Sequence, residues 1–226
     1  MDAAKALAQT TLFGVLEPGA LAEIAQRTVA RRYRKGSILF VQGEEGQRCF
    51  AIVSGTVKLS AYHADGREAV LAVLGPGDVF GELALFDDAP RSADATALED
   101  AELLSLDRSA LNEAVASHPE IATALLRVLG RRLRQANEAF QDIAFFDVPG
   151  RVARRLADLA DSHGVEVDEG VMIDISLSQE SLAQMVGATR ESVNKALALL
   201  KRRGLVARSG KRYYVSDVGR LRSRAH

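Results

Sequence analysis

Residues 178–203 read SQESLAQMVGATRESVNKALALLKRR, and this stretch has the pattern of two short helices joined by a glycine turn. Ser178 suits the N-cap of the first helix and Thr189 that of the second, because hydroxyls accept hydrogen bonds from the free N–H groups of a first turn. Helix, tight Gly187-Ala188 turn and helix predict a helix-turn-helix. The predicted apolar faces are Leu182, Ala183 and Val186 in the first helix, and Val193, Ala196, Leu197 and Leu200 in the second.

The second helix of this motif enters the major groove of DNA with its N-terminal half. Arg190 can bond O6 and N7 of guanine there, and Glu191 can accept from N4 of cytosine. Thr189 and Ser192 are expected to bond phosphates. The alternative is an ordinary solvated helix face. The predicted DNA-binding residues are Ser178, Thr189, Arg190, Glu191, Ser192, Lys195 and Lys211.

The sequence after these helices is basic and has the pattern of a β-hairpin. Leu205–Arg208 and Arg212–Val215 flank Ser209-Gly210-Lys211, which predicts a wing with a basic tip. Residues 176–226 contain eleven Lys/Arg and three Asp/Glu, a balance of +8, whereas residues 1–175 carry −9. A basic end on an acidic body favours a polyanionic partner for that end.

A longer helix is predicted from about Pro119 to Phe145, because proline suits a first helical turn. Apolar residues recur in it at alternating steps of four and three over three heptads, which is typical of a helix that pairs with its copy. This predicts a homodimer; the alternative is an amphipathic core helix. Ile121, Leu125 and Val128 form a second apolar face that suits packing on the β domain. The heptad stripe is Ala122, Leu126, Leu129, Leu133, Ala136, Phe140 and Ile143.

Residues 31–106 have the pattern of a β domain, because short β-prone runs alternate there with glycine turns. Residues 11–30 before them read as two short helices broken at Pro18-Gly19. The β-prone runs are Ser37–Val41, Cys49–Val53, Thr56–Tyr62, Glu68–Leu74, Ala93–Leu98 and Ala101–Leu106.

The segment Asp147–Gly150 interrupts the helical pattern and is the predicted domain boundary. After it, Arg151–Ser162 reads as a helix, a loop rich in glycine and acids runs to Gly170, and Val171–Ile175 has the pattern of a short strand. The predicted fold class is α+β. Its parts are a β-roll domain of the jelly-roll kind in residues 1–117, a dimerisation helix in 118–146, and a winged helix-turn-helix domain in 147–226.

Composition bounds the class of protein. With 226 residues, 47% of them apolar, the chain can bury a core as one large domain or two small ones. No stretch approaches the roughly 18 apolar residues of a membrane span, and Met1–Thr10 lacks the features of a signal peptide. We therefore expect a cytoplasmic protein without a membrane partner.

Residues that build metal and catalytic sites are few and scattered. The single cysteine, Cys49, leaves no internal disulfide and no cysteine-built metal or iron–sulfur site. The histidines, at 63, 118, 163 and 226, are too scattered for a haem sensor or for a cupin-type metalloenzyme, which needs clustered ligands. No nucleophile and base occur at a recognisable spacing. We expect no metal and no catalytic residue.

Several motifs, taken together, resemble one known family. The run FGELALFDDAPRSA, Phe80–Ala93, resembles the phosphate-binding cassette of cyclic-nucleotide-binding domains. The upstream GEEG and the turn Gly75–Asp78 fit that domain too. The helix ending in FDVPGR and the segment VGATRESVNKAL resemble the cyclic-AMP receptor protein family (the CRP/FNR superfamily), with the greatest similarity to its actinobacterial members. The resemblance covers nearly the whole chain.

The resemblance implies a ligand site. In the family, the cassette's glutamate holds the ribose 2′-hydroxyl, its arginine pairs with the cyclic phosphate, and a neighbouring Ser or Thr adds a phosphate bond. These roles fall on Glu82, Arg91 and Ser92, with the backbone of Gly81 and Leu83 nearby. A planar guanidinium suits a phosphate diester. The alternative is a structural ion pair between Glu82 and Arg91 without ligand.

The family's adenine contacts come from the dimer helix, at a Thr followed by Ser or Asn. Ala136 and Asn137 stand at those positions here, so that Asn137 fits the pattern and Ala136 lacks the hydroxyl. The resemblance implies a cyclic mononucleotide effector, cyclic AMP first and cyclic GMP second.

These observations predict a homodimeric, allosteric transcription regulator, not an enzyme, that binds inverted-repeat double-stranded DNA under cyclic-nucleotide control. RNA polymerase is the further partner implied, and Pro149-Gly150 is the predicted hinge. One alternative is the same regulator acting without a cyclic nucleotide or with another effector. The alternatives from other classes are a cyclic-nucleotide-binding regulatory protein that acts on a protein partner, and a small β-roll enzyme.

Overall fold

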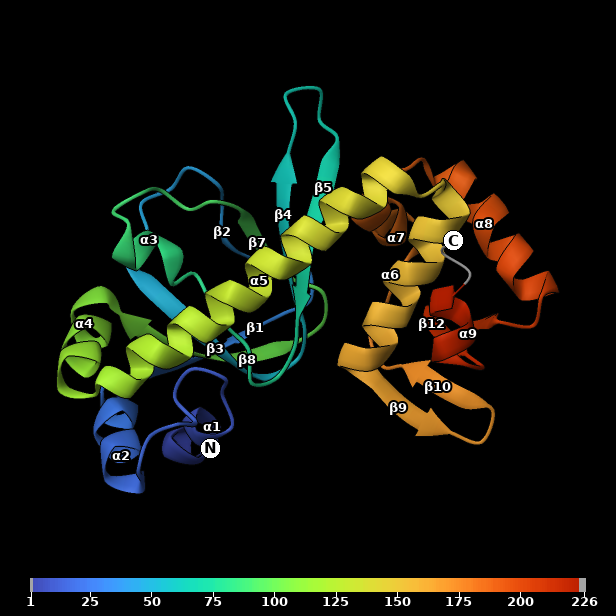
Figure 1. Ribbon diagram of the computed structural model, residues 1–226. Helices are drawn as coiled ribbons and strands as arrows, with labels where there is room; N and C mark the ends of the chain where they lie inside the picture. The colour runs from blue at the N-terminus through green and yellow to red at the C-terminus, as the bar shows by residue number, and fades with distance from the viewer. Residues whose placement is uncertain (1, 224–226) are drawn as a thin grey trace. The chain divides into compact units, whose positions relative to one another are not determined.

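The computed structural model describes residues 2–223 (Figure 1). Contacts within the chain divide it into two compact units, which are described separately. The first comprises the chain up to Tyr62 together with Leu71–Arg134, and the second comprises His63–Val70 and the chain from Gln135 onward. The long helix α5 (Pro119–Phe145) contributes residues to both units.

Two four-stranded sheets form the β domain, as the sequence predicted, and all of their residues except Glu68–Val70 belong to the first unit. Their strand orders are β1-β8-β3-β6 and β2-β7-β4-β5. The rings of Phe40, Phe50 and Phe80 pack against one another in its core, with ring centroids 5.3 to 6.0 Å apart. The strands are β1 (Val29–Tyr33), β2 (Ile38–Phe40), β3 (Arg48–Ser54), β4 (Val57–Tyr62), β5 (Glu68–Leu74), β6 (Val79–Phe80), β7 (Asp94–Ala97) and β8 (Ala101–Asp107).

Short helices complete the first unit and share a second apolar cluster with the strands. They are α1 (Ala3–Ala8), α2 (Pro18–Gln26), α3 (Leu83–Phe86) and α4 (Arg108–Ser117). The prediction of helix in residues 11–30 was wrong for 11–16, which form turns, and β1 already begins at Val29. The turns begin where Thr10 Oγ1 accepts a hydrogen bond from the Phe13 N–H at 3.0 Å.

Helix α5 has two apolar faces, and they differ in exposure. Ile121, Leu125 and Val128 are buried, which confirms the predicted second face, and Leu129 packs against the same cluster. The remaining large residues of the heptad stripe stay exposed, so the apolar pattern continues beyond what the first unit covers. These exposed residues are Leu126, Leu133, Phe140 and Ile143.

The second unit is built around helix α6 (Val148–His163), against which α7, α8 and α9 pack. A four-stranded sheet in the order β11-β12-β10-β9 completes it. The predicted inner faces of α7 and α8 are buried in full. The elements are α7 (Gln179–Val186), α8 (Arg190–Arg202), α9 (Val218–Ser223), β9 (Gly164–Val167), β10 (Gly170–Ile173), β11 (Val206–Ser209) and β12 (Arg212–Val215).

The connection between α5 and α6 differs from the expected hinge. Pro149 and Gly150 lie in the first turn of α6, and Asp147 caps that helix by accepting a hydrogen bond from the Gly150 N–H at 2.8 Å. Only Phe146 and Asp147 therefore separate the two helices. The predicted acidic loop before Gly170 also contains a strand, β9, whose residues are all exposed and so lack an alternating pattern.

Candidate functional site

The cassette residues line one small cavity of about 40 Å³ in the first unit. Strand β6 leads into Gly81, whose φ of +76° turns the chain into helix α3. The structure brings together all five cassette residues that the sequence singled out. The cavity is lined by Phe40, Leu59, Gly81, Glu82, Leu83, Ala84, Arg91, Ser92, Ala93 and Arg132.

Arg91 is fixed in this cavity by backbone oxygens. Its side chain is only 6% exposed; Nη1 donates to the Gly81 carbonyl at 2.6 Å and Nη2 to the Arg48 carbonyl at 2.7 Å. The guanidinium lies 4.2 Å from the centroid of the Phe40 ring. A Cβ at position 81 would lie 2.8 Å from Nη1 and would displace the guanidinium, and the left-handed φ of Gly81 also favours glycine. Among the described residues, this guanidinium has no carboxylate partner. Its position is fixed, and its charge is available to bind an anion.

Glu82 pairs with an arginine that the sequence had not singled out. Arg132 of α5 donates from Nη1 to one carboxylate oxygen of Glu82 and from Nη2 to the Val79 carbonyl. The other oxygen, Oε2, is buried and has no hydrogen-bond partner among the described residues. The pKa of Glu82 is raised above its ordinary value, because the effect of burial exceeds the opposing effect of the nearby cations of Arg132 and Arg91. The ion pair between Glu82 and Arg91, the alternative drawn from the sequence, is wrong: Arg132 is the partner.

Ala136 and Asn137, the predicted base contacts, are exposed residues of α5 in the second unit. Neither is among the residues that line the cavity. Their role thus depends on the resemblance and not on this geometry.

The helix-turn-helix forms as the sequence predicts. Ser178 Oγ accepts from the Ser181 N–H at 2.9 Å and Thr189 Oγ1 from the Ser192 N–H at 3.2 Å, so both predicted caps are confirmed. Gly187 ends α7 with a left-handed φ of +61°. On α8, Arg190, Glu191 and Lys195 are exposed and Ser192 is half-buried. Lys195 Nζ lies 2.7 Å from Glu191 Oε1. That pair is solvated and so holds both side chains only weakly.

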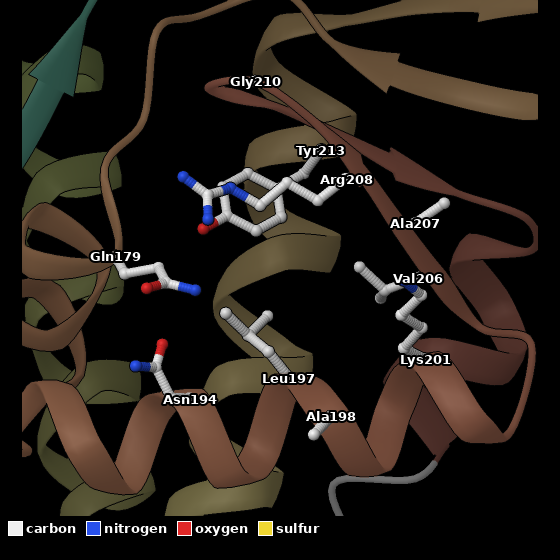
Figure 2. A pocket seen from close by; sticks show the side chains of 10 residues that line it. All are labelled: Gln179, Asn194, Leu197, Ala198, Lys201, Val206, Ala207, Arg208, Gly210 and Tyr213. Carbon is white, nitrogen blue, oxygen red and sulfur yellow. The ribbon is translucent and has the colours of Figure 1, made fainter.

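The wing follows α8 directly. Strands β11 and β12 pair in register from Val206 with Val215 to Ser209 with Arg212. The turn between them contains Gly210, at φ +58°, and the exposed Lys211. A cavity of about 390 Å³ lies between the wing and α8 (Figure 2). Both predicted strands of the hairpin are thus confirmed, and its tip is basic.

Known protein families match both the β domain and the helix-turn-helix domain of the chain. A family model described as "Cyclic nucleotide-binding domain" matches residues 30–118, and one described as "Crp-like helix-turn-helix domain" matches residues 150–224. The CRP-like cAMP-activated global transcriptional regulator of Mycobacterium tuberculosis is 43% identical over 219 residues, which cover 97% of this chain and 98% of that protein. The chain belongs to the cyclic-AMP receptor protein family of transcription regulators.

Solved structures of the family share the fold. The c-di-GMP-responsive global regulator CLP of Xanthomonas campestris is similar with a TM-score of 0.77 and 26% identity, over 89% of this chain and 100% of that chain. The catabolite activator protein of Thermus thermophilus has 33% identity and a TM-score of 0.55, over 96% and 98%. The chain is thus a regulator with a cyclic-nucleotide-binding domain and a DNA-binding helix-turn-helix.

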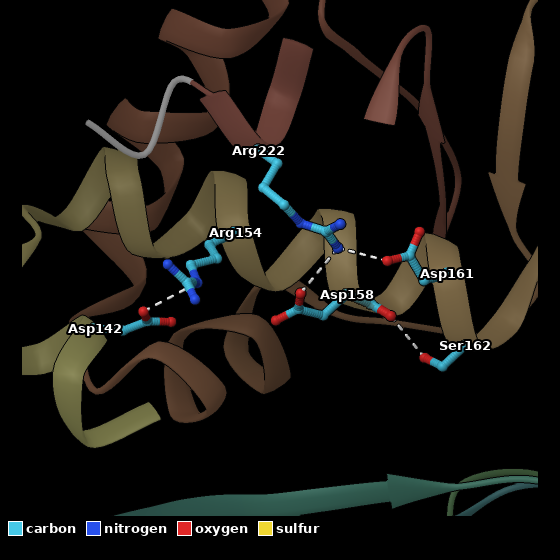
Figure 3. Close-up of polar contacts among 6 residues, drawn as sticks. All are labelled: Asp142, Arg154, Asp158, Asp161, Ser162 and Arg222. Atoms are coloured by element: carbon cyan, nitrogen blue, oxygen red, sulfur yellow. Dashed lines mark hydrogen bonds and ion pairs between the residues drawn. The ribbon is translucent and has the colours of Figure 1, made fainter. Parts of the chain in front are cut away.

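Polar contacts in this regulator connect α6 to the end of α5 and α9 to α6 (Figure 3). Arg154 Nε lies 3.1 Å from Asp142 Oδ1, and Arg222 bridges Asp158 and Asp161. Arg151 donates to the Phe146 carbonyl at 3.0 Å and to the Val186 carbonyl at 2.9 Å. The side chain of Arg151 thus connects the α5–α6 junction with the last residue of α7.

Within residues 2–223, no group of three or more His, Cys, Asp or Glu side chains is arranged to hold a metal ion. No helix in this part of the regulator has the length and apolar character to cross a membrane. His226 lies outside the described residues.

Proposed function

We propose that this family member is a homodimer that binds inverted-repeat DNA and is controlled by a cyclic mononucleotide, cyclic AMP first. The observation that supports it most is the preorganised Arg91, a buried cation without a carboxylate partner among the residues described. The names of its relatives support cyclic AMP as the effector. We retain the division into a sensing domain in residues 1–117, a dimerisation helix in 118–146 and a DNA-binding domain in 147–226.

In this proposal the sugar–phosphate part of the effector contacts the cassette. Arg91 and Ser92 bind the cyclic phosphate, and Glu82 accepts a hydrogen bond from the ribose 2′-hydroxyl through its free oxygen Oε2. The backbone of Gly81 and Leu83 completes the site. The described cavity of about 40 Å³ is smaller than the roughly 300 Å³ of a typical ligand pocket. Binding therefore requires side chains at its mouth to move.

The base would be recognised from the dimer helix, by Asn137 and by the residue at position 136. Ala136→Thr is expected to tighten cyclic AMP binding by about two- to tenfold, because one added neutral hydrogen bond contributes about 0.5–1.5 kcal/mol. Titration calorimetry of the wild type and the variant measures this change. Ala136→Val, similar in shape but without the hydroxyl, is the control; equal tightening by valine would contradict a base hydrogen bond.

On DNA, Arg190 is expected to read a guanine of a half-site close to TGTGA, with two half-sites about one helical turn apart. Arg190→Ala should weaken binding to the inverted repeat by about 1–3 kcal/mol and relax discrimination at one base pair. Fluorescence anisotropy with the intact repeat, single base-pair variants and random duplex measures both effects. An equal loss on every sequence would make Arg190 a phosphate contact instead.

Control of the DNA-binding domain would pass through the end of α5. The contacts of Asp142 with Arg154 and of Arg151 with the Phe146 carbonyl connect α5 to α6. An effector that favours one arrangement of the dimer helices would therefore shift the DNA-binding unit, by as much as its affinities for the two arrangements differ. RNA polymerase is the partner expected once the regulator is on DNA.

A second effector deserves a direct test, because the similar regulator CLP is described as responsive to c-di-GMP. Both nucleotides offer phosphodiesters to Arg91. Competition of cyclic AMP, cyclic GMP and c-di-GMP against one fluorescent cyclic nucleotide ranks the three. The proposal predicts that cyclic AMP competes best.

A further inference from the structure

The loop with the sequence GEEG, residues 43–46, has no role in the proposed function, yet it is bonded to the cassette arginine. The Gly43 N–H donates to the Arg91 carbonyl at 2.9 Å, and the Arg91 N–H donates to the Glu44 carbonyl at 2.8 Å. Two backbone hydrogen bonds thus join Arg91 to the first half of this loop.

The second half of the loop packs against the Arg91 side chain. A Cβ at position 46 would lie 3.3 Å from both Cζ and Nη1 of Arg91, and only 2.4 Å from the Cβ of Ala84 in α3. Glycine at position 46 therefore allows the loop backbone to approach both groups closely. A shift of this loop would move the guanidinium as well as its neighbour α3.

Arg108, the first residue of α4, holds the loop and α3 together (Figure 1). Its Nη2 donates to the Gly46 carbonyl at 3.1 Å and to the Ala84 carbonyl at 2.6 Å. A planar guanidinium presents several donors in fixed directions, which suits simultaneous bonds to two segments. Arg108 does not line the cassette cavity, so its effect on a ligand must pass through these two segments.

The same guanidinium also contacts the turn that leads from α3 to Arg91. Nη1 of Arg108 donates to the carboxylate of Asp88. With a φ of +52°, Asp88 is the one residue other than glycine with a positive φ within residues 2–223. Such a conformation persists where the surrounding structure imposes it. The Asp88 side chain is largely exposed, so this pair is weak, and the two carbonyl bonds of Arg108 supply most of the constraint.

Stability alone does not explain the arrangement of Arg108. Its Nε is buried and has no hydrogen-bond partner among the described residues. A buried donor without an acceptor lowers stability, and such costs are typical of functional sites. Burial lowers the pKa of Arg91, and the nearby cation of Arg108 acts in the same direction. The two guanidiniums are therefore close enough to interact, although the structure fixes each through separate carbonyls.

We infer that Arg108 is a positioning residue for the ligand: it fixes the loop 43–46 and α3 so that Arg91 faces the cyclic phosphate in one orientation. Arg108 does not contact the ligand itself. The role of the loop is to transmit this constraint to Arg91. The inference rests on the proposed binding of a cyclic mononucleotide at the cassette, and it adds a residue outside the cavity to that site.

Titration calorimetry of Arg108→Met with cyclic AMP tests this role, because methionine is unbranched and lacks the three hydrogen bonds. Binding should weaken about tenfold, as when a partner that orients the ligands of a metal site is removed. Arg108→Lys keeps the charge but not the planar fork, and should weaken binding about fivefold. Arg27→Met is the matched control. It breaks an ion pair with Glu113 of α4 outside the cavity, and should bind cyclic AMP like the wild type.

The two diastereomers of cyclic AMP phosphorothioate separate positioning from a general loss of stability. Sulfur replaces one or the other exocyclic oxygen of the phosphate, so the ratio of the two affinities reports how Arg91 faces that phosphate. In Arg108→Met this ratio should differ from the wild-type ratio by about threefold or more, the size of effect expected from one weakened hydrogen bond. Thermal unfolding checks the fold of each variant, and Arg108→Lys gives the same readouts if the methionine variant does not fold.

The outcomes distinguish this inference from the proposed function. A folded Arg108→Met protein with wild-type affinity, or one that loses affinity for both diastereomers equally, would overturn the inference and leave the cassette assignment intact. Arg108→Lys binding as tight as that of the wild type would assign the effect to charge and would overturn positioning as well. A wild type that binds no cyclic nucleotide would overturn the proposed function, and this inference with it.

Discussion

Replacing Arg91 by alanine is expected to weaken cyclic AMP binding about 100-fold or more. The guanidinium is the cation that the cassette directs at the cyclic phosphate, and it is only 6% exposed. A buried anion that loses its charge-assisted partner loses about 2–5 kcal/mol of binding free energy, well above the cost of one neutral hydrogen bond. Titration calorimetry of purified wild type and variant measures the loss.

The control must separate binding from folding, because Arg91 also donates to the carbonyls of Gly81 and Arg48. Thermal unfolding shows whether the variant keeps the β domain. Arg48→Ala removes a nearby arginine side chain that pairs with Asp107, yet keeps the carbonyl that Arg91 needs, so it should bind cyclic AMP like the wild type. A folded Arg91→Ala protein that binds within threefold of the wild type would disprove the assignment of the cassette.

Leu133→Asp is expected to convert the dimer into a monomer. Leu133 is 63% exposed on α5, in line with Leu126, Phe140 and Ile143, which are 69%, 73% and 61% exposed. Large apolar side chains repeated at heptad spacing suit a partner helix, and a carboxylate in that seam would be buried without a partner. Sedimentation should give the monomer mass at micromolar concentration. DNA binding should weaken strongly, because one half-site loses its tethered partner.

Gln135→Asp adds the same charge to an exposed position of α5 outside the heptad stripe, and this variant should remain dimeric. Leu129→Asp is the poorer choice, since Leu129 packs against the core of the first unit and its loss would also reduce stability. A wild type that sediments as a monomer, or a dimeric Leu133→Asp variant, would refute the assignment of the stripe.

Much of the fold could be predicted from the sequence because its patterns are local. Each predicted β run overlaps a strand, and Ser178 and Thr189 cap the helices as their chemistry requires. The failures have physical causes. Strand β1 pairs with β8 although its residues are mostly exposed, and β9 is exposed throughout, so neither has the alternation that marks a half-buried strand.

The site was predictable only in part. The cassette residues converge as the motif implied, but the partner of Glu82 is Arg132, 50 residues away in the sequence. Arg132 lies four residues after the buried Val128, so helical spacing was the available signal for its direction.

The affinity of the wild type for the inverted-repeat duplex, with and without saturating cyclic AMP, tests the central claim most directly. Fluorescence anisotropy at a fixed salt concentration measures both values, with random duplex as the reference. Effector control predicts that cyclic AMP tightens binding to the repeat at least about tenfold, which is within the usual range of allosteric coupling, and that it does so much less on random DNA. Equal affinity for the repeat with and without cyclic AMP would contradict cyclic AMP control.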